Sequence, residues 1–263
     1  MTEEPVLLTV DARGVATVTF NRPEVNNAYN GALLDGLLRA LDALERRADL
    51  RAVVLRGNGR HFQAGADLAW VRGVRDQDAA ANERASLVTA EAVRRLNEAP
   101  CPTVALIRGA CIGGGTGIAA ACDVVVAAEG AFFAISETRW GLMAGIIIPQ
   151  LVDAMGVRQV RRYALTGERF GAQEARRIGL VHEVVPDDRL EAEGARIVDA
   201  ILLNAPDATA QTKRRSLLVA RSTLSADALD PLVREHAAKR QSDEAAEGLA
   251  SFAEKRKPAW YRG

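Results

Sequence analysis

The sequence has no long apolar segment and no excess of either charge. Among its 263 residues, 34 Lys and Arg balance 34 Asp and Glu, so the formal net charge is zero. This balance gives no reason to expect a nucleic acid or an anionic membrane as partner. No apolar run reaches the roughly 18–20 residues that a membrane span needs, and residues 1–5 lack the apolar core of a secretion signal. We therefore expect a cytoplasmic protein that binds neither nucleic acid nor membrane.

Cysteine and histidine are scarce as well, with three of each in the chain. The histidines are scattered and the cysteines lack the spacing of metal ligands, so we expect no bound metal. An odd number of cysteines also fits poorly with a disulfide framework. We expect Cys101, Cys111 and Cys122 to be buried thiols in a reducing compartment.

Apolar residues, by contrast, make up 48% of the chain, which is enough for a sizeable core. Apolar and β-branched runs predict strands at 6–10, 15–20, 52–55, 103–107 and 124–126. Helical patterns alternate with them, and Asn30 is expected to cap the first helix. This alternation predicts an α/β fold. From residue 157 the patterns are mostly helical, so we expect a core of residues 1–200 and a helical region of residues 201–263.

Residues 108–123 are the most informative part of the chain. An apolar run at 103–107 leads into Gly113, Gly114 and Gly115, and residues of high helix propensity follow. Glycines let the backbone approach a ligand closely, and a helix N-terminus offers unpaired N–H groups. Such an arrangement stabilises negative charge on an oxygen, which can belong to a phosphate or to a developing oxyanion.

A second loop, residues 61–68, connects the chain to a predicted helix through small residues. Two interpretations are open for it. It is either a second place where backbone N–H groups face a ligand or an ordinary connection between a strand and a helix, and this stretch by itself favours the ordinary connection.

Glu137 follows Ser136 at the start of a short predicted helix. An acid in the first turn is stabilised by the helix dipole, which is a purely structural role. The apolar surroundings, among them Phe133 and Trp140, also favour a partly desolvated carboxylate with a raised pKa, suited to proton transfer. The local sequence supports both interpretations equally.

Four sequence patterns then occur in order along the chain. They are Asn21-Arg22-Pro23 with Asn27-Ala28, Phe62-Gln63-Ala64-Gly65-Ala66-Asp67-Leu68, Gly113-Gly114-Gly115 ending at Cys122-Asp123, and Ser136-Glu137 with Gly141-Leu142. In this order and spacing they resemble the crotonase superfamily, specifically its enoyl-CoA hydratases and isomerases. The stretch 136–150 looks closest to hydratases that act on methylglutaconyl-CoA or isohexenylglutaconyl-CoA.

The resemblance implies an α/β fold, a crotonase-type spiral of repeated ββα units whose C-terminal helices build trimers, often paired into hexamers. It also implies an acyl-CoA thioester as substrate. CoA then arrives as part of the substrate, and no separate cofactor is expected.

The resemblance assigns roles to individual residues. The N–H groups of Ala66 and Gly114 would form an oxyanion hole for the thioester carbonyl, and Glu137 would be the catalytic acid or base. The residues implied to hold the CoA part are Asn27, Ala28, Ala64, Gly65, Asp67, Leu68 and Gly113. Those implied to line the acyl pocket are Gly117, Trp70 and Trp140.

One position departs from the family pattern. Typical hydratases of the family carry two catalytic glutamates, and the first of them is matched here by Gly117. With Glu137 alone, three activities stay open. We predict hydration of a branched or glutaconyl-type enoyl-CoA. The alternatives are isomerisation of a Δ3 to a Δ2 enoyl-CoA by a single proton shuttle, and acyl-CoA binding by a catalytically weak subunit.

Overall fold

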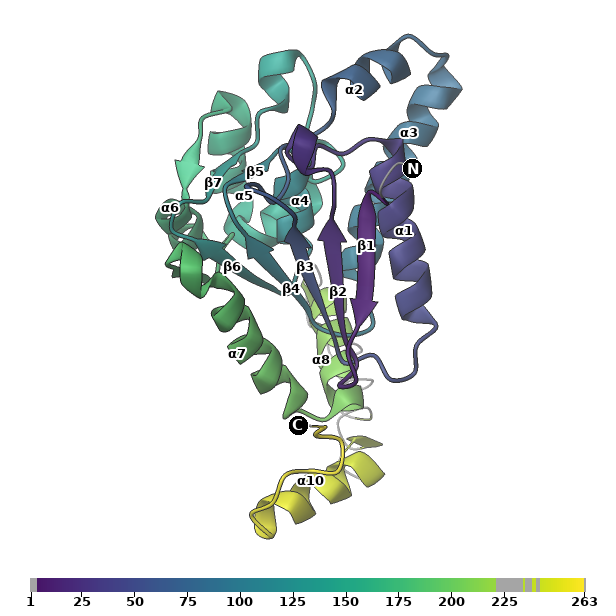
Figure 1. Ribbon diagram of the computed structural model, residues 1–263, viewed down its shortest axis with the longest axis vertical. Coiled ribbons are helices and arrows are strands. Elements are labelled where there is room, and N and C mark those ends of the chain that lie inside the picture. Colours follow the sequence, from purple (N-terminus) through teal and green to yellow (C-terminus); the bar gives the residue numbers. More distant parts are fainter. Residues whose placement is uncertain (1–3, 221–233, 235–237, 240–241, 263) are drawn as a thin grey trace.

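The computed structural model describes residues 4–220, 234, 238–239 and 242–262 (Figure 1). Its main sheet has the strand order β1-β2-β3-β4-β6-β9. The strands are β1 (Val6–Val10), β2 (Val15–Phe20), β3 (Ala52–Gly57), β4 (Thr103–Ile107), β6 (Val124–Ala128) and β9 (Glu183–Val185). β1 and β2 pair antiparallel, and the other neighbours in the sheet pair parallel. Each run that predicted a strand from the sequence is confirmed.

The main sheet is buried on both faces, and alternate residues of a strand enter different cores. In β4, Ala105 and Ile107 join the larger core, whereas Val104 and Leu106 join the smaller one. Helices α1 (Gly31–Glu45) and α3 (Ala79–Asn97) cover the first face, and α7 (Leu190–Leu202) covers the second. Burial on two sides explains why these strands are continuous apolar runs.

The start of α1 is set by a local interaction. The Asn30 side chain accepts a hydrogen bond from the backbone N–H of Leu33 at 3.1 Å, which confirms the predicted cap. Leucines at helical spacing then face the larger core, and Leu33 and Leu37 are fully buried there.

A second, smaller sheet positions the candidate site. Its strands are β5 (Ala110–Ile112), β7 (Phe132–Ala134) and β8 (Phe170–Gly171), in that order. Gln63 joins it through an isolated bridge to Cys111 of β5. The segments that follow β3, β4 and β6 therefore all reach this sheet, so successive ββα turns are stacked along the chain. This arrangement is the predicted spiral, although the sequence pattern did not indicate β5.

The remaining helices follow from the same turns. They are α2 (Leu68–Arg75), α4 (Gly114–Ala120), α5 (Ile148–Thr166), α6 (Ala172–Arg177), α8 (Pro206–Val219) and α10 (Asp243–Ala253), with short 3-10 helices η1 (Pro23–Val25), η2 (Glu137–Trp140) and η3 (Asp187–Arg189). Gly156 interrupts α5 with φ 75° and ψ 153°, so two helical segments meet there at a kink.

Figure 1 shows α2 at one end of the molecule and α10 beyond the opposite end of the main sheet. Part of the predicted region 201–263 lies outside the described residues, and the division at residue 200 stays a prediction. Within the described ranges, no helix is both long and apolar enough to cross a membrane.

Candidate active site

A cavity of about 420 Å³ lies where three loops of the spiral meet. It is formed by the loop after β3, the junction of β5 with α4, and the segment that contains η2. The predicted site residues that line it are Ala64, Gly65, Ala66, Leu68, Gly113, Gly114, Glu137 and Trp140. Segments far apart in the sequence thus contribute to one site.

The junction of β5 with α4 supplies the first backbone donor. Gly113 has φ 54° and ψ −123°, a conformation that glycine adopts without strain, and α4 begins directly after it. The Gly113 N–H donates to the Ala134 carbonyl of β7 at 2.8 Å, which fixes the turn against the small sheet. As the first residue of α4, Gly114 has no acceptor for its N–H among the described residues, so this donor is available in the cavity.

The loop after β3 supplies the second donor. The buried Gln63 amide braces it, since its Nε2 donates to the Gly65 carbonyl and its Oε1 accepts from the Gly65 N–H, both at 2.9 Å. Tyr29 and Ala66 form an isolated parallel bridge. In it, the Tyr29 N–H donates to the Gly65 carbonyl and the Tyr29 carbonyl accepts from the Asp67 N–H. The Ala66 N–H itself has no acceptor in the part of the chain that the structure describes. The loop is therefore more than a plain connection: it presents a backbone donor to the cavity.

Asp67 closes this loop by capping α2. Its Oδ1 accepts from the N–H of Ala69 at 3.0 Å, and its Oδ2 forms an ion pair with Arg22 at 3.2 Å. Hydrogen bonds from Trp70, Ala69 and Arg22 lower the pKa of the Asp67 carboxyl although its burial opposes them. Asp67 is thus fully engaged in holding the loop, and it does not line the cavity.

Glu137 opens η2 and is the only acidic side chain among the described residues that line the cavity. Its Oε1 lies against Gly113, because a Cβ placed on Gly113 would be 3.0 Å away from it. Its Oε2 is buried and has no hydrogen-bond partner among the described residues. Burial raises the pKa of the Glu137 carboxyl, and hydrogen bonds from its own and the Ser136 backbone offset part of this effect. A carboxyl with these properties suits general acid–base chemistry.

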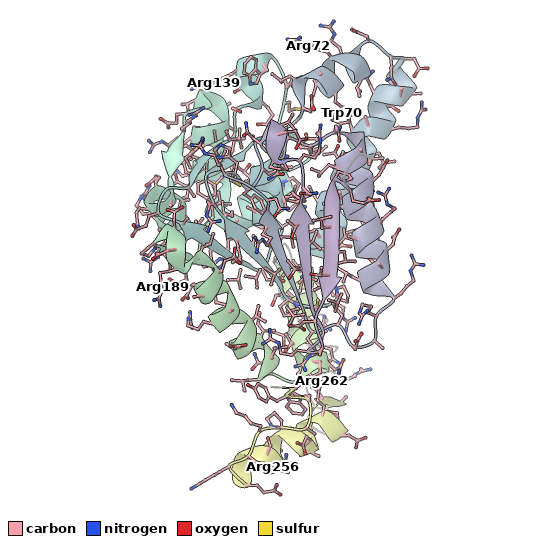
Figure 2. The ribbon with its side chains drawn as sticks, in the orientation of Figure 1. Trp70, Arg72, Arg139, Arg189, Arg256 and Arg262 are labelled. Atoms are coloured by element: carbon pink, nitrogen blue, oxygen red, sulfur yellow. The ribbon has the colours of Figure 1, made fainter. Side chains whose placement is uncertain are left out.

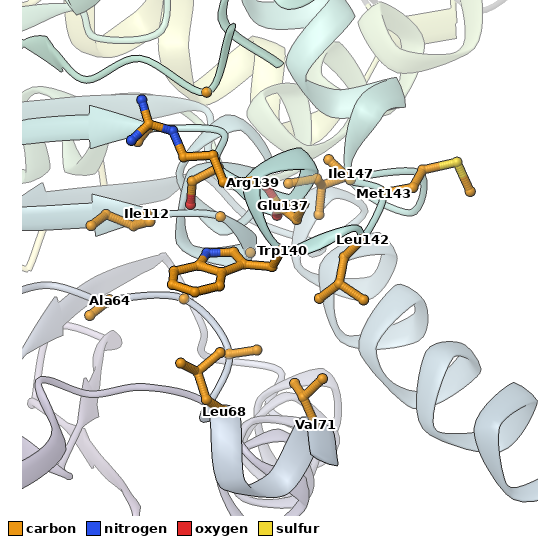
Figure 3. Close-up of a pocket in the computed structure, with 18 of the residues that line it drawn as sticks. Ala64, Leu68, Val71, Ile112, Glu137, Arg139, Trp140, Leu142, Met143 and Ile147 are labelled. Atoms are coloured by element: carbon orange, nitrogen blue, oxygen red, sulfur yellow. The ribbon is translucent and has the colours of Figure 1, made fainter. Parts of the chain in front are cut away.

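The walls of the cavity are mostly apolar. Trp140 and Leu142, from the segment of Glu137, face Leu68 and Val71 of α2 across the cavity (Figure 3). Trp140 is 63% exposed, so an apolar ligand group would find an incompletely covered surface here.

Two arginines add positive charge to this lining, Arg139 and Arg169. Neither has a carboxylate within 4.0 Å among the described residues, and Arg139 forms no ion pair with Glu137 there. The Arg169 guanidinium lies 5.0 Å from the centre of the Phe132 ring. The cavity therefore combines one carboxyl with two guanidinium groups that an anion can reach.

Several predicted site residues lie outside the cavity lining. Asn27 is fully buried, its Nδ2 donates to the carbonyls of Asn58 and His61, and its Oδ1 accepts from the Arg22 N–H. Ala28 is also buried, and its carbonyl accepts from the Arg22 side chain at 2.6 Å. These contacts leave the Asn27 side chain without a free polar atom, so it holds the loop rather than facing the cavity.

Gly117 and Trp70 also lie outside the cavity lining, and each packs against a residue that does line it. A Cβ on Gly117 would be 2.2 Å from Cγ2 of Ile147, and it is Ile147 that lines the cavity in its place. Trp70 packs edge-on against the Tyr29 ring, with ring centroids 5.7 Å apart. The structure thus gives Trp70 an indirect place, behind Tyr29.

The cysteines are buried, as the sequence predicted. Burial raises the pKa of Cys101 and of Cys122 to about 12, and that of Cys111 well above its ordinary value, so these thiols are poor nucleophiles. His61 and His182 accept hydrogen bonds through Nδ1 from the backbone N–H groups of Ala110 and Val125. In the described ranges, no three residues of the kinds that bind metals lie together.

Sequence reasoning missed Tyr29, Gln63 and Arg169 as parts of the site. Tyr29 and Arg169 line the cavity, and Gln63 braces the Ala66 loop. Their positions depend on contacts between distant segments. The one local signal was a glutamine within a run of small residues, at a place where the chain turns.

The chain is similar to known proteins over almost its whole length. Residues 11–263 match the family model described as enoyl-CoA hydratase/isomerase. A Thermus thermophilus protein assigned as an enoyl-CoA hydratase is 35% identical over 96% of this chain and 99% of its own length. The mitochondrial Delta(3,5)-Delta(2,4)-dienoyl-CoA isomerase of Dictyostelium discoideum is 30% identical over 94% of this chain and 88% of its own.

Solved structures agree with this similarity. The crystal structure of an enoyl-CoA hydratase from Shewanella pealeana superposes with a TM-score of 0.93 at 34% sequence identity, covering 97% of this chain and 96% of that one. The crotonase-type spiral predicted from the sequence is thereby confirmed. With its fold and nearly all of its length in agreement, this chain belongs to the enoyl-CoA hydratase/isomerase family.

Proposed function

We propose that this protein is a hydratase that adds water across the 2,3 double bond of an enoyl-CoA thioester. One observation carries the proposal: Ala66 and Gly114, whose N–H groups have no acceptor among the described residues, line the same cavity as Glu137. The family acts on acyl-CoA thioesters, and both activities in its name pass negative charge onto the thioester oxygen.

The two amides supply the oxyanion hole. When water adds to the β-carbon, electrons move onto the thioester oxygen, which becomes an enolate oxygen. Two preorganised donors stabilise that charge, and losing one such donor typically costs about 3 kcal/mol of transition-state stabilisation. The Gln63 brace and the Tyr29 bridge hold the Ala66 donor in place before the substrate arrives.

Glu137 moves the protons. As its carboxylate, Glu137 takes a proton from water while the water oxygen bonds to the β-carbon. The carboxyl then gives a proton to the α-carbon, the enolate collapses to the thioester, and the carboxylate is restored. No further reactant is needed. Burial favours this cycle because it brings the pKa of Glu137 closer to neutrality.

Isomerisation is the second candidate. A single carboxyl suffices to move a proton from the α-carbon to the γ-carbon and back, and Glu137 is the only acid in the described lining. Because Ile147 occupies the space beside Gly117, the described residues offer no second carboxylate on that side of the cavity.

For the acyl group, we propose a branched or glutaconyl-type chain. The apolar wall of Leu142, Met143 and Ile147 can take a branched carbon chain, and Arg139 and Arg169 can take a carboxylate. The family relationship alone does not choose between acyl groups, so this part of the proposal depends on the two arginines.

The test is a panel of straight, branched and carboxylated acyl-CoA esters, assayed for hydration and for isomerisation. We expect hydration of 2-enoyl-CoA esters, and a loss of about 10²–10⁴-fold in kcat for Glu137→Gln. Conjugation of a 3-enoyl-CoA without hydration would make the protein an isomerase. Tight binding without turnover, unchanged in Glu137→Gln, would make it an acyl-CoA-binding subunit.

Arg139 gives a sharper test of the acyl group. Arg139→Gln should lower kcat/KM for a carboxylated enoyl-CoA by about 10–100-fold, because a hydrogen bond to a charged group contributes about 1.5–3 kcal/mol. An uncharged ester of the same length should change little. Arg72→Gln is the matched control, since Arg72 is exposed on α2 and does not line the cavity. Equal losses for both esters would place Arg139 on the CoA part instead.

Assembly into trimers or hexamers belongs to the proposal, as does a cytoplasmic location. Figure 2 shows Arg139 and Trp70 at one end of the molecule and Arg256 and Arg262 at the other. Arg256 is also paired with Glu247 and Glu254. Within one chain, Arg256 and Arg262 lie far from the cavity, so we propose that they would reach the phosphates of a bound CoA only from a second copy of the chain.

A further inference from the structure

Tyr29 contacts both segments that carry the backbone donors. Its N–H donates to the Gly65 carbonyl at 2.9 Å, and its carbonyl accepts from the Asp67 N–H at 2.8 Å, so it holds the chain on either side of Ala66. Its ring lies on Gly114, where a Cβ would be 2.6 Å from Cε1 of Tyr29. The backbone hydrogen bonds to Gly65 and Asp67 and the ring contact with Gly114 together restrict the position of the Tyr29 ring. The edge-on contact with Trp70 restricts it further.

Tyr29 is one of the residues that line the cavity. Its hydroxyl has no hydrogen-bond partner among the described residues, although the residue as a whole is half-buried. Burial and the negative charge of Glu137 raise the pKa of the phenol to about 12. The phenol therefore stays protonated at neutral pH, and it can donate a hydrogen bond but cannot act as a base.

Gly117 leaves Glu137 as the one carboxyl in the described lining of the cavity, so a donor of this kind would help to orient the water. Hydration requires that the water oxygen be held while Glu137 accepts its proton, and α4 presents no polar side chain for this purpose beside Ile147. In the described lining, the hydroxyl groups are those of Tyr29 and Ser136. Of the two, only Tyr29 combines a rigid ring position with contacts to both donor segments.

We propose that the Tyr29 hydroxyl is the second polar group of the hydration site and donates a hydrogen bond to the oxygen that bonds to the β-carbon. Tyr29 keeps its proton throughout, while Glu137 takes the proton of the water and supplies the one that reaches the α-carbon. This inference rests on the proposed hydratase activity, and it explains how a site with one carboxyl can orient water.

Tyr29→Phe tests the proposal, because it removes the hydroxyl and keeps the ring that packs on Gly114 and Trp70. We expect kcat for hydration to fall about tenfold or more, because the variant loses one hydrogen bond to the reacting oxygen. KM, the affinity for a saturated acyl-CoA and the melting temperature should stay near the wild-type values, because the oxyanion hole is unchanged. Hydration at the wild-type rate would overturn the proposal.

Two further variants separate the hydroxyl from its neighbours. In Tyr163→Phe, a phenol that donates to Glu174 outside the cavity is lost, and hydration should be unaffected. In Ser136→Ala, the other lining hydroxyl is lost, and a loss of hydration there together with an active Tyr29→Phe would assign the water to Ser136. If Tyr29→Phe lost hydration and acyl-CoA affinity together, the role would be structural and the proposal wrong. Absence of hydration by the wild-type protein would overturn the proposed function itself.

Discussion

At the scale of single residues, the site depends on how tightly Glu137 is enclosed. Its carboxyl lies against a glycine that has a positive φ, and its Oε2 is buried without a partner among the described residues. The protein thus retains a group that is costly to bury in its charged form, which is typical of a group kept for chemistry rather than for stability.

This cost predicts how stability depends on pH. Burial raises the pKa of Glu137 in the folded protein above that of the unfolded chain, so the unfolded chain loses its proton first as the pH rises. Stability therefore falls between the two pKa values, by about 1.4 kcal/mol for each pH unit that separates them. Glu137→Gln should be more stable than wild type at pH 8, and this advantage should vanish at pH 4. Urea denaturation at the two pH values measures it, and an advantage equal at both would contradict the assignment.

At the scale of elements, the contact between α4 and α5 determines the shape of the site. Gly117 of α4 lies against Ile147, the residue before α5, so closely that no side chain fits between them. Ile147 is almost fully buried and belongs to the larger core. Packing therefore requires a glycine at position 117. The contact between α4 and Ile147 leaves no room there for the first of the two glutamates that typical hydratases carry.

It follows that restoring the second glutamate alone should fail. Gly117→Glu would place a charged side chain into Ile147 and should destabilise the protein by about 3 kcal/mol or more, through overpacking and burial of a charge. Gly73→Glu is the matched control, because no atom of the described residues lies within 4 Å of a Cβ at that position in α2. Thermal and urea denaturation of both variants provide the comparison. A stable Gly117→Glu with faster hydration would show that Ile147 moves aside readily.

At the scale of the whole molecule, two cations connect the spiral to the C-terminal region. Arg51, just before β3, donates to the carbonyls of Leu202, Asn204 and Trp260 at 3.1, 3.0 and 2.6 Å. Lys213 of α8 donates to the Cys101 carbonyl and pairs with an Asp carboxylate next to β6. Both cations are largely buried, so the sheet and the C-terminal segments are held by interactions that water screens little.

Removing the first of these cations should loosen the C-terminal region. Arg51→Met keeps an aliphatic chain but leaves three carbonyls without their donor, and we expect a loss of about 2–4 kcal/mol in the free energy of unfolding. Hydrogen exchange should show the largest increase near Trp260. Arg47→Met, which breaks an exposed ion pair with Asp49, should change stability by less than about 1 kcal/mol. Similar values for the two variants would argue against the connecting role of Arg51.

Features set by near neighbours could be predicted from the sequence. The strands of the main sheet follow from apolar runs. The Asn30 cap requires only one side chain next to one backbone N–H, and the burial of the cysteines follows from their residue type. The family followed from the order of several motifs, and the structural similarity confirms it. Each of these inferences requires only interactions within a few residues or a pattern in the linear chain.

The tertiary structure alone decided which of the marked residues meet. Asn27, Ala28 and Asp67 hold loops through hydrogen bonds, and Gly117 packs on Ile147. Tyr29 lines the cavity although no sequence pattern indicated it. These positions depend on how the ββα turns stack. Stacking brings together segments that are far apart in the sequence, and no local sequence pattern indicates that they will meet. The sequence by itself determined the spiral and the presence of Glu137. Only packing between distant turns decided what surrounds that carboxyl, and therefore its pKa and its chemistry.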